Sequence, residues 1–167
     1  LKFGGEFYFS DVYADRRCPE KIRINPILYR ECLGGALYYK DFERIAREVG
    51  FIDTRIVHKR EIDISKPEIK ILVGNIRFCS ITYRLWKIKG LEDACEDYGH
   101  IGIYKGGIPD SSDIFKLDNS HIFYKNKPER ICGNTALMLS NTRFKKYFKV
   151  IGVFHEHFGE FKNCANI

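Results

Sequence analysis

Cys32 lies in the stretch of this sequence whose residue types are best suited to chemistry. Gly34 and Gly35 follow it closely, and a segment with the spacing of an amphipathic helix begins just beyond them. A thiolate can act as a nucleophile or as a ligand of a soft ion, and a large ligand must be able to reach it. Paired glycines leave the backbone open because they carry no Cβ. We therefore take Cys32 as the candidate functional residue, with Glu31, Gly34 and Gly35 as its neighbours.

The remaining five cysteines are spread along the chain at long, irregular intervals, at Cys18, Cys79, Cys95, Cys132 and Cys164. No two of them have Cys-x-x-Cys spacing, which argues against a zinc module and against a dense disulfide framework. Free thiols in a reducing cytosol are the default, so we expect a cytoplasmic protein. None of the five matches a recognisable ligand motif. The default interpretation of each is an inert small hydrophobe, which for Cys79 means a core position, and Cys164 has the alternative interpretation of an accessory thiol of the tail.

Two further polar groups are weaker candidates. His155 and His157 alternate as at the end of a strand, which would place both imidazoles on one side. A metal site there needs a third ligand, and Cys164 is the only nearby one, so the spacing does not favour a metal pair. Asp11 is predicted to end a strand, where the sites of α/β proteins lie, and it is kept as a neighbour of the site.

Composition narrows the classes of function. The chain has 167 residues, of which 44% are hydrophobic and 30% charged, with a net charge of +6. No apolar run approaches the ~18 residues that a membrane-spanning helix needs. The basic residues are mostly interleaved with acidic ones, and the densest group, residues 143–149, is typical of a solvated helix face. We therefore expect neither a nucleic acid nor a membrane as a partner.

The elements that must position Cys32 form an α/β part over residues 1–88. Alternating and aromatic-rich stretches predict strands, and helical spacing bounded by proline or glycine predicts helices. The expected strands are residues 5–13, 55–62 and 78–88, and the expected helices are residues 26–33, 38–49 and 67–72. The first strand would be an exposed aromatic edge, from which we expect association into a homo-oligomer.

A second part is predicted over residues 89–167, as a small β-rich α+β domain. An acidic, turn-rich stretch at residues 90–99 separates it from the first part. The expected strands are residues 100–104, 114–117, 121–125 and 150–154, and the expected helical segments are residues 134–139, with Asn134 as N-cap, and 141–147. The whole chain is thus predicted to pass from α/β to α+β architecture.

Several stretches resemble a known family. Residues 1–11, with Gly4-Gly5 before a strand, are similar to a segment of class I S-adenosylmethionine-dependent methyltransferases. Residues 9–13 and 31–38 together resemble the arsenite S-adenosylmethionine methyltransferases, and residues 46–51, 77–87 and 104–108 follow in the same order. The resemblance covers nearly the whole chain and weakens after about Gly152.

This resemblance implies a fragment of a larger enzyme. The chain would hold the fifth, sixth and seventh strands of the methyltransferase sheet, followed by the C-terminal domain of the family. Cys32 matches the most C-terminal of the cysteines that bind arsenic(III), while the other ligands and the glycine-rich S-adenosylmethionine loop would lie in a missing N-terminal domain. The intact enzyme would methylate arsenite or its thiol conjugates. This chain alone would bind no S-adenosylmethionine and would be inactive.

Two alternatives remain at this point. The chain could be a non-catalytic module that binds a metalloid or another protein. It could also be a fragment of a methyltransferase that acts on another small molecule. A glycine-rich loop and further cysteines upstream of Leu1 would favour the arsenite enzyme over both.

Overall fold

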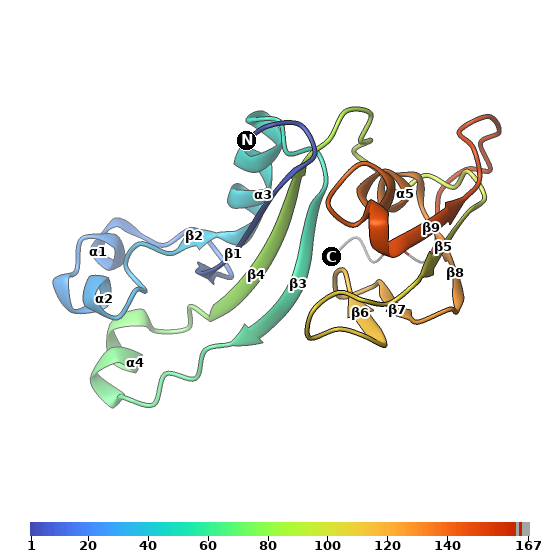
Figure 1. The fold of residues 1–167 in the computed structure, drawn as a ribbon. Helices are drawn as coiled ribbons and strands as arrows, with labels where there is room; N and C mark the ends of the chain where they lie inside the picture. Colours follow the sequence, from blue (N-terminus) through green and yellow to red (C-terminus); the bar gives the residue numbers. More distant parts are fainter. Residues whose placement is uncertain (163, 165–167) are drawn as a thin grey trace.

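The computed structural model describes residues 1–162 and 164 and shows a mixed α/β arrangement with several small sheets. The first half of the chain forms a four-stranded sheet from β1 (Gly5–Ala14), β2 (Leu37–Tyr38), β3 (Thr54–Glu61) and β4 (Phe78–Lys87). Their order is β2-β1-β4-β3. β4 runs antiparallel to both β1 and β3, whereas β1 and β2 are parallel. Figure 1 shows the long strands β3 and β4 side by side, with the second half of the chain beside β3.

β4 links the two halves through its alternating side chains. Ile81, Tyr83 and Leu85 are buried in one cluster, which also contains Tyr13 and Phe42. Trp86, which points to the opposite face, belongs to a second cluster built mainly from the second half of the chain. The predicted strand at residues 78–88 is confirmed, because its period-2 pattern lets both faces bury apolar groups.

Four helices accompany this sheet, namely α1 (Glu20–Arg23), α2 (Pro26–Arg30), α3 (Tyr39–Glu48) and α4 (Pro67–Val73). Asn25 caps α2 by accepting from the backbone N–H groups of Ile27 and Leu28 at 2.9 and 3.2 Å. α2 ends at Arg30 rather than at Leu33, so the predicted helix was three residues too long. No helix among residues 1–162 is long and apolar enough to cross a lipid bilayer.

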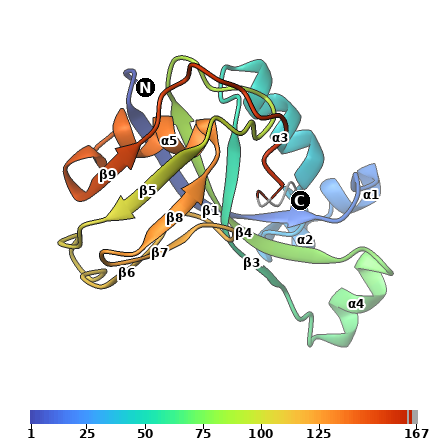
Figure 2. The same cartoon turned by 90° about the vertical axis from the view of Figure 1, so that its right-hand side faces the viewer.

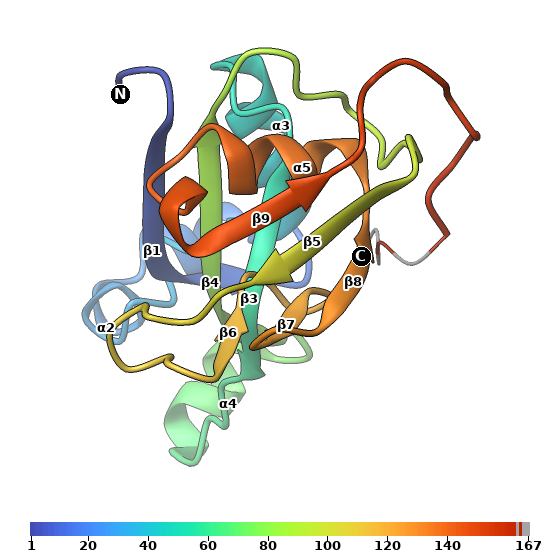
Figure 3. The same cartoon turned by 45° about the vertical axis from the view of Figure 1, so that its right-hand side comes forward.

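The second half contains β5 (His100–Tyr104), β6 (Ile114–Lys116), β7 (Ile122–Tyr124), β8 (Pro128–Ile131), α5 (Gly133–Ser140), the 3-10 helix η1 (Lys145–Tyr147) and β9 (Phe148–Ile151). β8, β5 and β9 form an antiparallel sheet, and β6 pairs with β7. Figures 2 and 3 show α5 next to β5 and β9. The core here consists largely of aromatic and aliphatic side chains, including Tyr104, Phe115, Phe144 and Met138.

Some predicted boundaries were wrong for identifiable reasons. β8 was missed because it begins with proline and carries charged side chains, both typical of an edge strand. The last strand is β9, which lies earlier than residues 150–154, so His155 and His157 fall outside it. β1 continues to Ala14, and Asp11 therefore lies within the strand rather than at its end.

One side of β1 has little pairing among the described strands. β2 contacts β1 only at Tyr13 and Ala14, so the segment from Gly5 to Val12 has a strand neighbour only on the β4 side. Phe7 and Tyr8 are about half exposed on this segment. The predicted exposed edge is therefore present, while association through it stays a prediction.

Candidate functional site

Cys32 occupies a backbone position that normally belongs to glycine. Its N–H donates to the carbonyl of Tyr29 at 3.1 Å, and the N–H of Leu33 donates to the carbonyl of Leu28 at 2.9 Å. These two bonds form a Schellman motif at the C-terminus of α2, with Cys32 at the C′ residue. The motif requires a left-handed backbone there, and Cys32 has a φ of 60°. A side chain in this conformation costs on the order of 1 kcal/mol.

The surroundings of Cys32 hold the turn in place and leave the thiol open. Leu33 and Leu28 are both buried in the same cluster, whereas Cys32 is exposed. Gly34 is required by packing, because a Cβ there would lie 3.1 Å from the backbone nitrogen of Tyr29. A Cβ on Gly35 would meet no atom within 4 Å, so packing does not explain that glycine.

The other two predicted neighbours have structural partners of their own. Glu31 pairs with Lys66 at 2.6 Å (Oε1 to Nζ), which connects the turn to the start of α4. Asp11 accepts from the backbone N–H of Val12 at 2.7 Å. The structure thus shows local contacts for both carboxylates and no direct interaction with the Cys32 thiol.

The left-handed backbone at Cys32 leads to a stability prediction. Cys32→Gly should raise the free energy of unfolding by about 0.5–1 kcal/mol, because glycine adopts this conformation without strain. Urea unfolding followed by circular dichroism measures the change. Cys79→Gly, near the start of β4 where the strand is paired with both β1 and β3, is the control and should lower stability. A lower free energy of unfolding in Cys32→Gly would contradict the claim that the backbone at Cys32 is strained.

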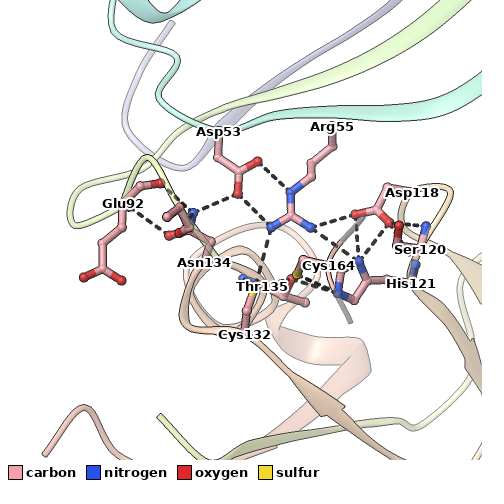
Figure 4. Close-up of polar contacts among 11 residues, drawn as sticks. Asp53, Arg55, Glu92, Asp118, Ser120, His121, Cys132, Asn134, Thr135 and Cys164 are labelled. Carbon is pink, nitrogen blue, oxygen red and sulfur yellow. Dashed lines mark hydrogen bonds and ion pairs between the residues drawn. The ribbon is translucent and has the colours of Figure 1, made fainter. Parts of the chain in front are cut away.

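A second polar region lies between β3 and the second half of the chain, centred on Arg55 (Figure 4). The guanidinium of Arg55 makes two hydrogen bonds to Asp53, at 2.6 and 2.7 Å, and one to Asp118 at 2.9 Å. Its Nη2 also lies 3.6 Å from the Sγ of Cys132. Although burial opposes it, the charges of Asp53 and Asp118 raise the pKa of Arg55 well above its ordinary value. This cation is therefore permanently charged and fully paired.

His121 adds an oriented imidazole to this region. Its Nδ1 lies 2.8 Å from Oδ1 of Asp118. Because a carboxylate can only accept, Nδ1 donates to Asp118, and Nε2 is the ring nitrogen left for other contacts. That Nε2 lies 3.4 Å from the hydroxyl of Thr135 and 3.7 Å from the Sγ of Cys164. Burial alone would raise the pKa of Asp118, but the hydrogen bond from His121 and the charge of Arg55 lower it to about 2.

Three of the cysteines that the sequence analysis interpreted as inert meet beside this network. The Sγ atoms of Cys95, Cys132 and Cys164 all lie within 4.8 Å of one another. Hydrogen bonds from the Cys164 and Cys95 thiols, together with the charge of Arg55, lower the pKa of the Cys132 thiol despite its burial. Local spacing rules missed this group because its members come from three distant segments. The described residues therefore contain a candidate soft-ion site that the sequence analysis did not find.

Asn134, His155 and His157 lie outside the cysteine group, and the predicted role of Asn134 was wrong. Asn134 is not the N-cap of α5; Cys132 is, since its Sγ accepts from the N–H of Thr135 at 3.4 Å. The Asn134 side chain instead donates to Asp53 at 2.8 Å. His157 pairs with Glu96 at 2.9 Å on the surface. Among the described residues, neither His155 nor His157 joins a group of side chains that could hold a metal.

A cavity of about 260 Å³ adjoins the cysteine group. Its lining includes Glu43 of α3, Arg55 of β3, and Cys95, His121 and Cys164 from the second half of the chain. Two of the three clustered thiols therefore face a space large enough for a small molecule.

Comparison with known proteins shows which proteins this chain is similar to. Residues 100–166 match the family described as the arsenite methyltransferase C-terminal domain. The arsenite methyltransferase of Aquipseudomonas alcaligenes is 51% identical over 165 residues, which are 99% of this chain and 48% of that protein. The chain is similar in sequence to arsenite methyltransferases. The human arsenite methyltransferase is 38% identical over 152 residues, which are 90% of this chain and 39% of that protein.

A solved structure of a similar protein supports the mixed α/β fold of this chain. The arsenic(III) S-adenosylmethionine methyltransferase from Chlamydomonas reinhardtii has a TM-score of 0.90 and 49% identity, over 96% of this chain and 54% of that one. The resemblance stated from sequence is thus confirmed, and so is a mixed α/β fold. The chain spans about half the length of the relatives that it matches.

Proposed function

We propose that this chain supplies the C-terminal half of an S-adenosylmethionine-dependent arsenite methyltransferase, and that Cys32 is one of the thiolates that hold arsenic(III). The observation that carries the proposal is the Cys32 turn. An exposed thiol occupies a left-handed position in which glycine would be more stable. Strain of this kind persists where the surrounding structure enforces it, and it gathers at functional sites.

The chemistry fits a soft, thiophilic substrate. Trivalent arsenic prefers thiolate ligands, and three of them leave one lone pair on arsenic. S-adenosylmethionine, when bound, supplies an electrophilic methyl group. Cys32 would then act by holding arsenic at a fixed point and angle, so that positioning provides most of the rate. Because the family's other arsenic ligands match no residue of this chain, the complete site would need a second half of the protein.

The glycine pair Gly106-Gly107 does not fit the glycine-rich loop of an S-adenosylmethionine site. Gly106 and Gly107 both have left-handed φ values, but they lie between β5 and β6 rather than between a strand and a helix. Such a loop does not present the helix N-terminus that nucleotide-binding glycine loops use. We therefore place the binding of the methyl donor on residues outside this chain.

The partly unpaired edge of β1 supports a larger sheet. Among residues 1–162 and 164, no strand pairs with the other side of the segment from Gly5 to Val12, and Phe7 and Tyr8 are exposed there. A strand of an N-terminal half would pair with this side. We propose that β1, β3 and β4 are the fifth, sixth and seventh strands of a class I methyltransferase sheet, and that the chain works in the cytoplasm.

Joining the two halves tests this function. The complementary N-terminal half of the Aquipseudomonas alcaligenes relative would be fused to Leu1 of this chain, and methylated arsenic would be measured by chromatography with mass detection. The joined protein should methylate arsenite, while this chain alone should not. A joined protein that binds S-adenosylmethionine but methylates only other small molecules, or nothing, would contradict the proposal.

A further inference from the structure

We propose that Cys95, Cys132 and Cys164 form a second arsenic site, which binds one trivalent thiophilic ion as a neutral three-thiolate complex. The site lies in the second half of the chain and does not involve Cys32. It requires no methyl transfer, so this inference does not rest on the proposed function.

The backbone holds the three thiols together before any ion binds. The N–H of Gly133, next to Cys132, donates to the carbonyl of Glu96 at 2.8 Å. The N–H of Phe161 donates to the carbonyl of Cys95 at 2.8 Å. Both bonds connect the segments that carry the cysteines. With all three Sγ atoms within 4.8 Å of one another, the thiols need only a small contraction to share one ion.

Charge favours a trivalent ion over a divalent one. The carboxylates of Asp53 and Asp118 already outnumber the guanidinium of Arg55 in this buried region. Three thiolates with a trivalent ion carry no net charge, whereas three thiolates with a divalent ion add a further negative charge. Burying an uncompensated charge is costly, so the neutral complex is the more stable occupant.

The number of available ligands also favours arsenic(III) over zinc. A tetrahedral zinc site needs a fourth ligand. Nε2 of His121 is the nearest candidate, at 3.7 Å from the Sγ of Cys164. His121 is nevertheless outside the group of mutually close ligand atoms among the described residues, which consists of the three cysteines alone. Three sulfur ligands suit the pyramidal geometry of arsenic(III).

The binding step balances without an oxidant or reductant. Arsenous acid carries three hydroxyl groups, and each is replaced by one thiol. Three As–O bonds and three S–H bonds break, three As–S bonds form, and each proton leaves with a hydroxyl as water. The cavity beside Cys95 and Cys164 gives the neutral acid a route to the thiols.

Native mass spectrometry of the reduced chain with arsenite tests the site. We expect a mass increase of one arsenic less three hydrogens in the wild type. The same adduct should form in Cys32→Ser and in Cys79→Ser, which serve as matched single-thiol controls. Losing a residue that only hydrogen-bonds to an ion ligand costs roughly 10–100-fold in affinity. Cys132→Ser and Cys164→Ser each remove a ligand itself, so they should weaken arsenic binding by more than that. Cys164 is less buried than Cys132, so its variant remains informative if Cys132→Ser fails to fold.

Three outcomes would overturn the inference. The first is an adduct that is lost in Cys32→Ser and retained in Cys164→Ser. The second is a chain two hydrogens lighter without arsenic, which would show a disulfide within the group. The third is a bound zinc ion that arsenite does not displace. None of these results tests methylation by the joined protein. The proposal of a three-cysteine site can therefore be wrong while the proposed methyltransferase function is right, and the reverse.

Discussion

Replacing Cys32 with serine is expected to reduce arsenic methylation by the joined protein by roughly 100-fold or more. The hydroxyl keeps the size of the side chain but is a poor ligand for a soft ion, so arsenic would be held by the remaining thiolates alone. A displacement of about 1 Å from the reactive position costs on the order of 100-fold in rate. Single-turnover methylation at saturating S-adenosylmethionine is the appropriate measurement, because it separates chemistry from product release.

Two matched variants separate ligand loss from unfolding. Cys79→Ser changes a partly buried thiol, whose Sγ donates to the carbonyl of Tyr13 at 3.7 Å, and it should keep wild-type activity. Cys32→Gly should be at least as inactive as Cys32→Ser although it is the more stable protein. Wild-type turnover in Cys32→Gly would show that the turn, and not the thiol, matters.

The second large effect is expected at Arg55. Arg55→Met should lower the free energy of unfolding by about 3–5 kcal/mol, because Asp53 and Asp118 would stay buried without their cation. Urea unfolding measures the difference. Arg16→Met is the control, since Arg16 is exposed and pairs with its sequence neighbour Asp15, and its urea midpoint should stay close to that of the wild type. A variant at Arg55 as stable as Arg16→Met would show that the network contributes little.

The pH dependence of the same variant gives an independent readout. The pKa of Asp118 is about 2 in the folded chain against an ordinary value of 3.8. Its stabilising contribution is therefore complete above about pH 4 and is lost as the pH falls through 2. Because the charge of Arg55 helps to lower this pKa, Arg55→Met should unfold at a higher pH during acid titration. An unchanged acid midpoint would contradict that coupling.

Local patterns in the sequence predicted the elements but not the contacts between them. The period-2 alternation of β4 identified the strand, and the glycine after α3 identified the end of that helix. Asn134 shows where local preference fails. Asparagine is a favoured N-cap, yet its side chain bonds to Asp53 and to the carbonyl of Glu92, and Cys132 takes over the cap.

The two cysteine sites also differ in how far local sequence predicts them. Cys32 could be singled out because the glycines that shape its turn are its neighbours in sequence. The left-handed backbone of Cys32 could not be predicted from the sequence. It depends on α2 ending at Arg30 and on the hydrogen bond from the N–H of Leu33 to the carbonyl of Leu28. Cys95, Cys132 and Cys164 meet only through the tertiary fold, and ligand-spacing rules apply to residues on one turn or hairpin.

Arsenic X-ray absorption on the joined protein tests the central claim, that Cys32 is an arsenic ligand, most directly. The Cys164→Ser background would remove the proposed second site from the signal. In that background we predict three sulfur neighbours around the bound arsenic when Cys32 is present, and two sulfurs with one oxygen in Cys32→Ser. Three sulfur neighbours in both proteins would contradict the assignment of Cys32.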